Sequence, residues 1–178
     1  MNICVYGASS NDINNAYIKA GEQLGELMAQ RGHGLVFGGG ANGMMGAVAR
    51  GARAFDGKII GVAPDFFNVD GELFDNCDEM IGTDTMRERK RVMEDMSDAF
   101  VVTPGGIGTF DEFFEILTLK NLELHHKPIV LLNTLGYFDS MITMLENAVA
   151  EGFASKRIMT LFDVAHDPRA VLEYLENN

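Results

Sequence analysis

The sequence has few positive charges, and this shortage excludes one large class of proteins. Its 178 residues contain 14 lysines and arginines against 26 aspartates and glutamates, giving a formal net charge of −12. Nucleic-acid-binding proteins generally present a broad basic surface to the phosphates. We therefore expect no nucleic-acid partner. Any phosphate site has to be built locally, from helix N-termini and a few placed cations.

Long hydrophobic runs and cysteines are also scarce. No apolar segment approaches the ~18 residues of a membrane-spanning helix, so we expect no membrane partner. The chain enters a strand directly, which predicts no export signal. Cys4 and Cys77 form no disulfide framework, as is usual in a reducing cytoplasm, where we expect the protein to reside. We see no repeat or low-complexity linker, which predicts a single domain over residues 1–178.

Short apolar runs alternate with amphipathic segments along the chain. Strands are expected at residues 2–6, 34–37, 58–62, 80–81, 99–102, 128–132 and 161–164. A first helix is expected to follow a turn at residues 7–12 and to end at about residue 31. Further helices are expected at 44–55, 83–97, 109–122 and 138–151, and a last helix should begin at Pro168 with Asp167 as its N-cap. The pattern predicts an α/β fold, a parallel sheet with helices on both faces, and ligands bound at the C-terminal strand ends. The acidic segment 65–78 should be a loop packed over something.

The stretch from Val101 to Glu115 carries the strongest functional signal, and the other segments are interpreted in relation to it. An apolar strand is broken by Pro104-Gly105-Gly106, and Thr109 is the expected N-cap of the following helix. A helix N-terminus that follows glycines leaves backbone N–H groups free and favours an anion. A structural alternative is a capping box, in which Thr109 and Glu112 satisfy each other's backbone donors. Gly105, Gly106 and Gly108 favour a ligand, because a cap does not need them all.

Two further glycine loops follow strands, at residues 7–10 and 38–43. The second matches the dinucleotide motif G-x-G-x-x-G. That motif belongs after the first strand, where this chain has Gly7-Ala8-Ser9-Ser10 instead. Close packing of helix against strand is the alternative explanation of the glycines in the second loop.

A cationic segment, Met86 to Arg91, stands out in this acidic chain. Charge runs on helices usually face solvent. Arg89 and Lys90, however, lie on the apolar stripe between Met86 and Met93, so at least one should point inward. An inward cation needs a ligand phosphate or a carboxylate such as Glu112. The four histidines lack metal-ligand spacing and predict surface or turn positions rather than a metal site.

These residues resemble the LONELY GUY family of cytokinin riboside 5′-monophosphate phosphoribohydrolases. Residues 104–112 match its P-G-G-x-G-T-x-x-E signature, residues 86–90 are similar to its M-x-x-R-K element, and residues 38–46 to its glycine loop. The resemblance extends from Val5 to about Phe153. It implies a Rossmann-like three-layer sandwich, a homodimer, and hydrolysis of the N-glycosidic bond of AMP or a related nucleoside monophosphate to free base and ribose 5-phosphate.

The resemblance also implies the site residues. Arg89 and Glu112 fall where the family has its catalytic pair, with the carboxylate expected to be ionised at a helix N-terminus. We expect substrate contacts from Ser9, Gly40, Met86, Lys90, Gly105, Gly106, Ile107, Gly108 and Thr109. No cofactor is expected. Many relatives carry the label lysine decarboxylase, but the sequence shows no evident cofactor-bearing lysine.

Departures from the family pattern leave the preferred base undefined. Arg87 replaces a common histidine, and residues 119–121 replace an aromatic and a glutamine that are usual near the base pocket. Gly71, between Asp70 and Glu72, stands where some members have a pocket glutamate. The alternative function is a non-catalytic nucleotide or cofactor carrier of the same fold, in which Arg89 and Glu112 only tie helix to loop.

Overall fold

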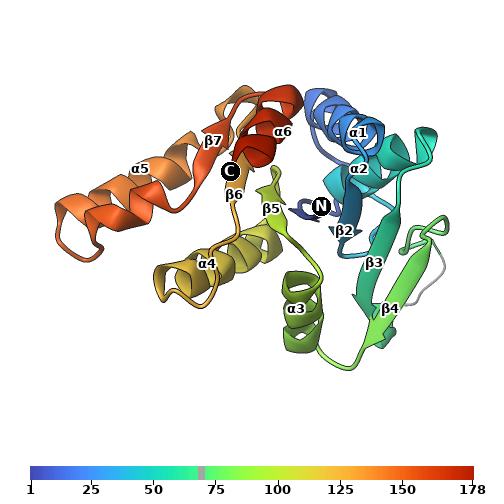
Figure 1. The fold of residues 1–178 in the computed structure, drawn as a ribbon, viewed down its shortest axis with the longest axis horizontal. Coiled ribbons are helices and arrows are strands. Elements are labelled where there is room, and N and C mark those ends of the chain that lie inside the picture. The colour runs from blue at the N-terminus through green and yellow to red at the C-terminus, as the bar shows by residue number, and fades with distance from the viewer. Residues whose placement is uncertain (68–70) are drawn as a thin grey trace.

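A computed structural model describes residues 1–67 and 71–178, and the strands among them form one parallel sheet (Figure 1). The strands are β1 (Asn2–Tyr6), β2 (Gly34–Phe37), β3 (Ile59–Pro64), β4 (Glu79–Thr83), β5 (Ala99–Val102), β6 (Ile129–Leu132) and β7 (Asp163–Ala165). Their order across the sheet is β4-β3-β2-β1-β5-β6-β7, and every neighbouring pair is parallel. The parallel arrangement follows from the strand and helix alternation, since a crossover helix returns the chain to the same end of the sheet.

Helices cover both faces, so the predicted three-layer sandwich is confirmed. One face carries α1 (Asn15–Gln30), α2 (Gly43–Ala54) and α6 (Pro168–Asn177), and the other carries α3 (Met86–Asp95), α4 (Ile107–Asn121) and α5 (Asp139–Ala150). Three short 3₁₀ segments complete the described chain: η1 (Asp65–Phe67), η2 (Thr134–Gly136) and η3 (Lys156–Thr160). Each helix of the described chain is too short or too polar to cross a membrane.

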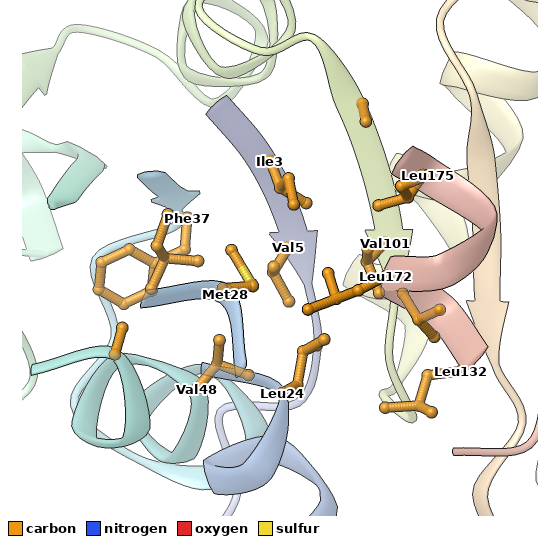
Figure 2. Packing of buried hydrophobic residues seen from close by; sticks show 14 of the residues in the cluster. Ile3, Val5, Leu24, Met28, Phe37, Val48, Val101, Leu132, Leu172 and Leu175 are labelled. Atoms are coloured by element: carbon orange, nitrogen blue, oxygen red, sulfur yellow. The ribbon is translucent and has the colours of Figure 1, made fainter. Parts of the chain in front are cut away.

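Alternate side chains of the strands fill two separate cores. On β1, Ile3 and Val5 pack under α1, α2 and α6 with residues such as Leu24 and Leu172 (Figure 2). The intervening residues of β1 point to the opposite core, beneath α3, α4 and α5. A strand buried on both faces reads as a continuous apolar run, which is why the central strands were predictable from composition. Full burial of one such aliphatic side chain stabilises the fold by about 1.5–3 kcal/mol.

The strand order creates one place where the loops diverge. From β1 the chain builds β2, β3 and β4 outward in one direction, then returns to place β5, β6 and β7 on the other side of β1. Loops that follow β1 and β5 therefore leave toward opposite faces of the sheet and open a crevice between them. The loop after β2 borders the same crevice, so all three predicted glycine loops meet at one edge.

Two predicted helix starts are wrong, and both involve the pattern T-x-x-E. Helix α4 begins at Ile107 with Gly106 as its extended N-cap, so Thr109 lies inside the first turn and is not the predicted N-cap; the alternative capping box with Glu112 does not form either. Helix α3 begins at Met86 rather than at residue 83 and has a side-chain cap, because Thr85 Oγ1 accepts the N–H of Glu88. Both segments carry the same residue pattern. Only the backbone entering each helix decides which threonine caps.

Candidate active site

A cavity of about 440 Å³ opens at the C-terminal edge of the sheet. Its walls come from the ends of β1, β2 and β5, the first turns of α3 and α4, and residues that follow β3. The lining residues are Gly7, Ala8, Ser9, Gly38, Gly40, Asn42, Met45, Phe67, Glu72, Leu73, Met86, Arg89, Lys90, Gly106, Ile107, Gly108, Thr109, Asp111 and Glu112. The volume is within the range of ordinary small-molecule sites.

A buried ion pair forms one wall of this cavity. Arg89 of α3 and Glu112 of α4 are 6% and 7% exposed, and Nη1 of Arg89 donates to Oε1 of Glu112 over 2.9 Å. The prediction that at least one cation of α3 points inward is therefore confirmed. Its partner within the chain is the carboxylate, so the guanidinium charge is already balanced. Removal of either partner would leave an uncompensated buried charge.

Backbone groups fix the position of the guanidinium. Nε of Arg89 donates to the carbonyl oxygen of Val62 over 3.1 Å, which ties α3 to strand β3. On the other side lies Gly38, at the end of β2, where an added Cβ would overlap Nη2 of Arg89. The absence of a side chain at Gly38 therefore makes room for the guanidinium group. Gly38 was predicted only as part of the glycine loop, and its residue pattern gives no sign of this contact with Arg89.

Burial changes the acidity of Glu112. Desolvation raises the pKa of this carboxyl from 4.5 to about 7, although the neighbouring Arg89 favours the ionised form. Glu112 also lies in the second turn of α4, beyond the unpaired amides of the N-terminus, because the helix starts at Ile107. The expectation of a carboxylate held ionised by a helix N-terminus is therefore wrong in its position, and burial shifts the pKa against the ionised form. Near neutral pH both protonation states are accessible, which suits a group that exchanges protons.

Lys90 lies beside this pair but is held differently. Its Nζ donates to Oδ2 of Asp111 over 2.8 Å and also forms an ion pair with Glu115. Burial opposes the charge of Lys90, but these two carboxylates outweigh burial and raise its pKa. The ammonium therefore stays charged and couples α3 to α4 at the rim of the cavity.

Free backbone amides form another part of the cavity wall. Among the described residues, no acceptor pairs with the N–H groups of Gly106, Ile107, Gly108 and Thr109 at the start of α4. An added Cβ at Gly106 or Gly108 would meet nothing within 4 Å, and neither glycine has a positive φ. Neither packing nor backbone conformation therefore requires glycine at these two positions. The amides face open space, the arrangement that binds an anion.

The glycine loop after β2 has a different character. Asn11 Oδ1 accepts the N–H of Gly43, and the carbonyl of Ala8 accepts the N–H of Met45, so donors at the start of α2 are already used. A Cβ at Gly43 or at Gly46 would overlap backbone oxygens. Close packing therefore accounts for Gly43, although its neighbours are backbone atoms of the loop after β1 rather than the strand that the alternative explanation invoked. A dinucleotide would find few free donors there.

The structure brings most of the predicted substrate-binding residues to the cavity, with one exception. Gly105 does not line it: a Cβ there would overlap Oγ1 of Thr109, so Gly105 lies behind the amides. Arg87 and residues 119–121 also lie outside the lining, the latter at the far end of α4. Glu72 lines the cavity, whereas Gly71 does not, and Asp70 falls outside the described residues.

Several lining residues were not predicted from the sequence. Phe67, at the end of η1, lines the cavity. Glu72 and Leu73 line it because Gly40 and Leu73 form an antiparallel bridge that holds this part of the chain against the glycine loop. The apolar residues in the acidic stretch 65–78 were the available signal. The prediction of a loop packed over another part of the fold is confirmed for residues 71–74, whereas residues 68–70 lie outside the described part of the chain. No group of three or more histidine, cysteine or acidic side chains in the described parts of the chain is arranged to hold a metal ion.

Comparisons with known proteins agree with this arrangement. The model of the family described as "Possible lysine decarboxylase" matches residues 45–175. A protein of Mycobacterium tuberculosis named cytokinin riboside 5′-monophosphate phosphoribohydrolase is 44% identical over 158 residues, covering 88% of this chain and 83% of its own. The rice protein LOGL5, a probable enzyme of the same name, is 38% identical over 96% of this chain and 71% of its own. The chain belongs to the LONELY GUY family.

A solved structure extends the likeness to a protein with another role. The molybdenum cofactor carrier protein of Chlamydomonas reinhardtii aligns with a TM-score of 0.75 and 26% identity, covering 99% of this chain and 96% of the carrier. The Rossmann-like architecture is therefore shared by family members named as hydrolases and by a protein named as a carrier. The chemistry of the site has to distinguish the two functions.

Proposed function

We propose that this LONELY GUY family member hydrolyses the N-glycosidic bond of a nucleoside 5′-monophosphate, AMP or a cytokinin riboside monophosphate, to the free base and ribose 5-phosphate. The observation that carries the proposal is the juxtaposition of a buried carboxylate of raised pKa, Glu112, with unpaired amides on the same short helix segment. The amides suit a phosphate and the carboxylate suits the sugar carbon about one helical turn away.

The 5′-phosphate would be bound mainly by the backbone. Both cations that line the cavity, Arg89 and Lys90, are engaged by carboxylates of the chain, and three acidic residues also line it. In an acidic site of this kind, fixed amides attract the phosphate without a mobile counter-charge. The phosphate would then hold the ribose in place while the reacting bond lies against Glu112, a positional rather than a chemical contribution.

The chemical step would use both protonation states of Glu112. As a carboxylate it would stabilise the positive charge that develops on the ribose, and orient the water whose oxygen bonds to C1′. The C1′–N bond breaks, its electron pair leaves with the base, the attacking water gives up one proton, and the base gains one. Arg89 would hold the carboxylate in place and offset negative charge on the departing base. A carboxyl with a pKa near 7 can accept the water proton near neutral pH.

The test replaces Glu112 with glutamine and measures adenine release from AMP. We expect a fall in kcat of about 10²–10⁴-fold, the usual contribution of a general acid or base. Glu94→Gln is the matched control, because the pKa of Glu94 is also raised to about 7, chiefly by burial, and Glu94 does not line the cavity. Undiminished release by Glu112→Gln would exclude the proposed role of the carboxylate.

The carrier function is the second candidate, and one observation favours it. The bonds from Arg89 to Val62 and Glu112 join α3, β3 and α4, so the pair could serve only to hold the fold together. A carrier and a hydrolase would bind the same ligand in the same cavity. Stoichiometric binding of AMP with no release of adenine would identify the carrier.

Lysine decarboxylation, the activity in the family description, has little support in the cavity. Lys90 is the lysine among the lining residues, and Asp111 and Glu115 engage its ammonium. A Schiff-base lysine has to become a neutral nucleophile, and these partners oppose that. We therefore propose a reaction that needs no cofactor.

We further propose a homodimer of single-domain protomers located in the cytoplasm. Ile107, Leu122 and Leu124, at the two ends of α4, are 82%, 61% and 69% exposed, and a second protomer could cover such apolar side chains. Both cysteines are free thiols, which is consistent with a reducing compartment. Light scattering during gel filtration tests the dimer, and a monomeric mass would exclude it.

A further inference from the structure

In the Pro104-Gly105-Gly106 turn, the carbonyl groups of Pro104 and Gly105 accept hydrogen bonds from other parts of the fold. The carbonyl of Pro104 accepts the N–H of Ala8 over 3.2 Å, and the carbonyl of Gly105 accepts the hydroxyl of Tyr137 over 2.5 Å. Tyr137 follows η2, more than thirty residues beyond the turn, and does not line the cavity. A distant part of the fold therefore contacts the turn through a residue outside the cavity lining.

A local network holds Tyr137 in place. The side chain of buried Asn133 accepts the N–H of Phe138 over 2.7 Å and donates to Asp139 over 2.7 Å, which fixes the chain on either side of the tyrosine. The ring of Tyr17, from α1, meets the tyrosine ring edge-on with a centroid distance of 5.9 Å. These contacts leave the hydroxyl group directed at the turn.

Peptide geometry relates this contact to the ligand. In a planar trans peptide the C=O and N–H groups point in opposite directions. Because the Gly105 carbonyl points back to Tyr137, the N–H of Gly106 points the other way. Gly106 lines the cavity, and this N–H has no acceptor among the described residues. The same peptide lies between two glycines, which restrict backbone rotation least, so without a partner for the carbonyl it could rotate and present an oxygen to the phosphate.

We propose that Tyr137 is a positioning residue for the 5′-phosphate, because its hydroxyl fixes the Gly105–Gly106 peptide with the amide directed into the cavity. This inference rests on the phosphate subsite of the proposed function and adds a residue that touches no substrate. The ligand class is a sugar 5-phosphate, and the effect of the tyrosine is confined to that group.

The test compares Tyr137→Phe with the wild-type protein by calorimetric titration of ribose 5-phosphate, AMP and adenosine. Loss of the hydroxyl should weaken binding of ribose 5-phosphate and AMP about three- to tenfold, the usual effect of one hydrogen bond, and leave adenosine unchanged. Tyr17→Phe is the matched control, because it removes a hydroxyl from the neighbouring ring. It should bind all three ligands like the wild-type protein.

Each outcome decides the proposal. Equal weakening of AMP and adenosine, an unchanged affinity for ribose 5-phosphate, or the same loss in Tyr17→Phe would overturn it. A wild-type protein that binds no ribose 5-phosphate overturns it together with the phosphate subsite. A wild-type protein that binds ribose 5-phosphate but releases no adenine from AMP contradicts only the hydrolase function.

A second measurement keeps the test independent of the variant's stability. Selective ¹⁵N labelling of glycine in the wild-type protein reports the amide of Gly106 directly. On addition of ribose 5-phosphate, this resonance should shift more than those of Gly32 and Gly152, which lie outside the cavity lining. An unmoved Gly106 resonance would overturn the proposal even if Tyr137→Phe failed to fold.

Discussion

A methyl group at Gly108 tests the phosphate site with little risk to the fold. Gly108 lies in the first turn of α4, its φ is not positive, and an added Cβ would meet nothing within 4 Å. The substitution Gly108→Ala therefore introduces no clash in the free protein. It places the methyl group in the open space next to the unpaired amides, where the phosphate is proposed to bind.

Gly108→Ala should make the protein slightly more stable and should weaken its binding of the phosphate. Alanine is more favourable than glycine within a helix by roughly 0.5–1 kcal/mol, so the variant should be slightly more stable. For a chain of this length, that gain raises Tm by about 1–4 °C. A methyl that displaces the phosphate from one charge-assisted hydrogen bond costs about 1.5–3 kcal/mol, which weakens binding about 10- to 100-fold.

Thermal unfolding and calorimetric titration of ribose 5-phosphate measure the two effects separately. Thr118→Ala is the matched control: it also raises the helix propensity of an exposed position of α4, but Thr118 does not line the cavity, so the variant should retain binding. If Gly108→Ala binds ribose 5-phosphate as tightly as the wild-type protein, the amides of α4 are not the phosphate site. A variant that loses both stability and binding would contradict the inference that glycine is not required there by packing.

Three further predictions concern the fold and the pH dependence. Gly38→Ala should displace Arg89 and break its buried bonds, with a loss of roughly 3–5 kcal/mol of unfolding free energy in urea titrations; a change below 1 kcal/mol would contradict the clash. The pKa of Glu112 is higher in the folded protein than its ordinary value of 4.5, so its stabilising contribution is complete below about pH 4.5 and is lost as the pH rises to about 7. Urea titrations at a series of pH values should show this decline in the wild-type protein and a smaller decline in Glu112→Gln, because the pKa of Glu94 is also raised to about 7 and contributes in both proteins. The value of kcat/KM for AMP should rise over the same range with an apparent pKa near 7; a flat activity profile would argue against a proton-exchanging carboxylate. Asp167→Ala removes the N-cap of α6 and should cost about 1 kcal/mol, seen as a Tm lower by about 2–4 °C with unchanged adenine release.

The sequence was sufficient to predict the layers of the fold. Central strands such as β5 and β6 are short apolar runs ended by turn residues, and each is buried on both faces, so composition alone located them. The cap at Asp167 followed from local chemistry in the same way. Edge strand β4 is five residues long, whereas only two residues were predicted. The prediction was too short because the side chains of β4 are largely exposed and lack an apolar pattern.

Helix starts depended on information that the residue pattern does not contain. Thr85 and Thr109 both begin a T-x-x-E sequence, yet only Thr85 caps a helix. Gly106 has the extended conformation of an N-cap, so α4 starts earlier and Thr109 becomes part of its first turn. The predicted N-cap at Thr109 is wrong for this reason, the alternative capping box with Glu112 does not form, and the Glu112 carboxylate pairs with Arg89 instead.

The sequence alone determined that a cation of residues 86–91 would point inward and that a helix would start after the glycines at 105–106. Both follow from helical phase and turn chemistry, which are local properties. Only the tertiary structure decided how they are joined. It filled the space beside Gly38 with the guanidinium, raised the pKa of Glu112 by burying it, and directed the hydroxyl of Tyr137 to the carbonyl of Gly105. These contacts link segments from 23 to 51 positions apart in the chain, and desolvation and reach across such separations are set by packing, which no local pattern contains.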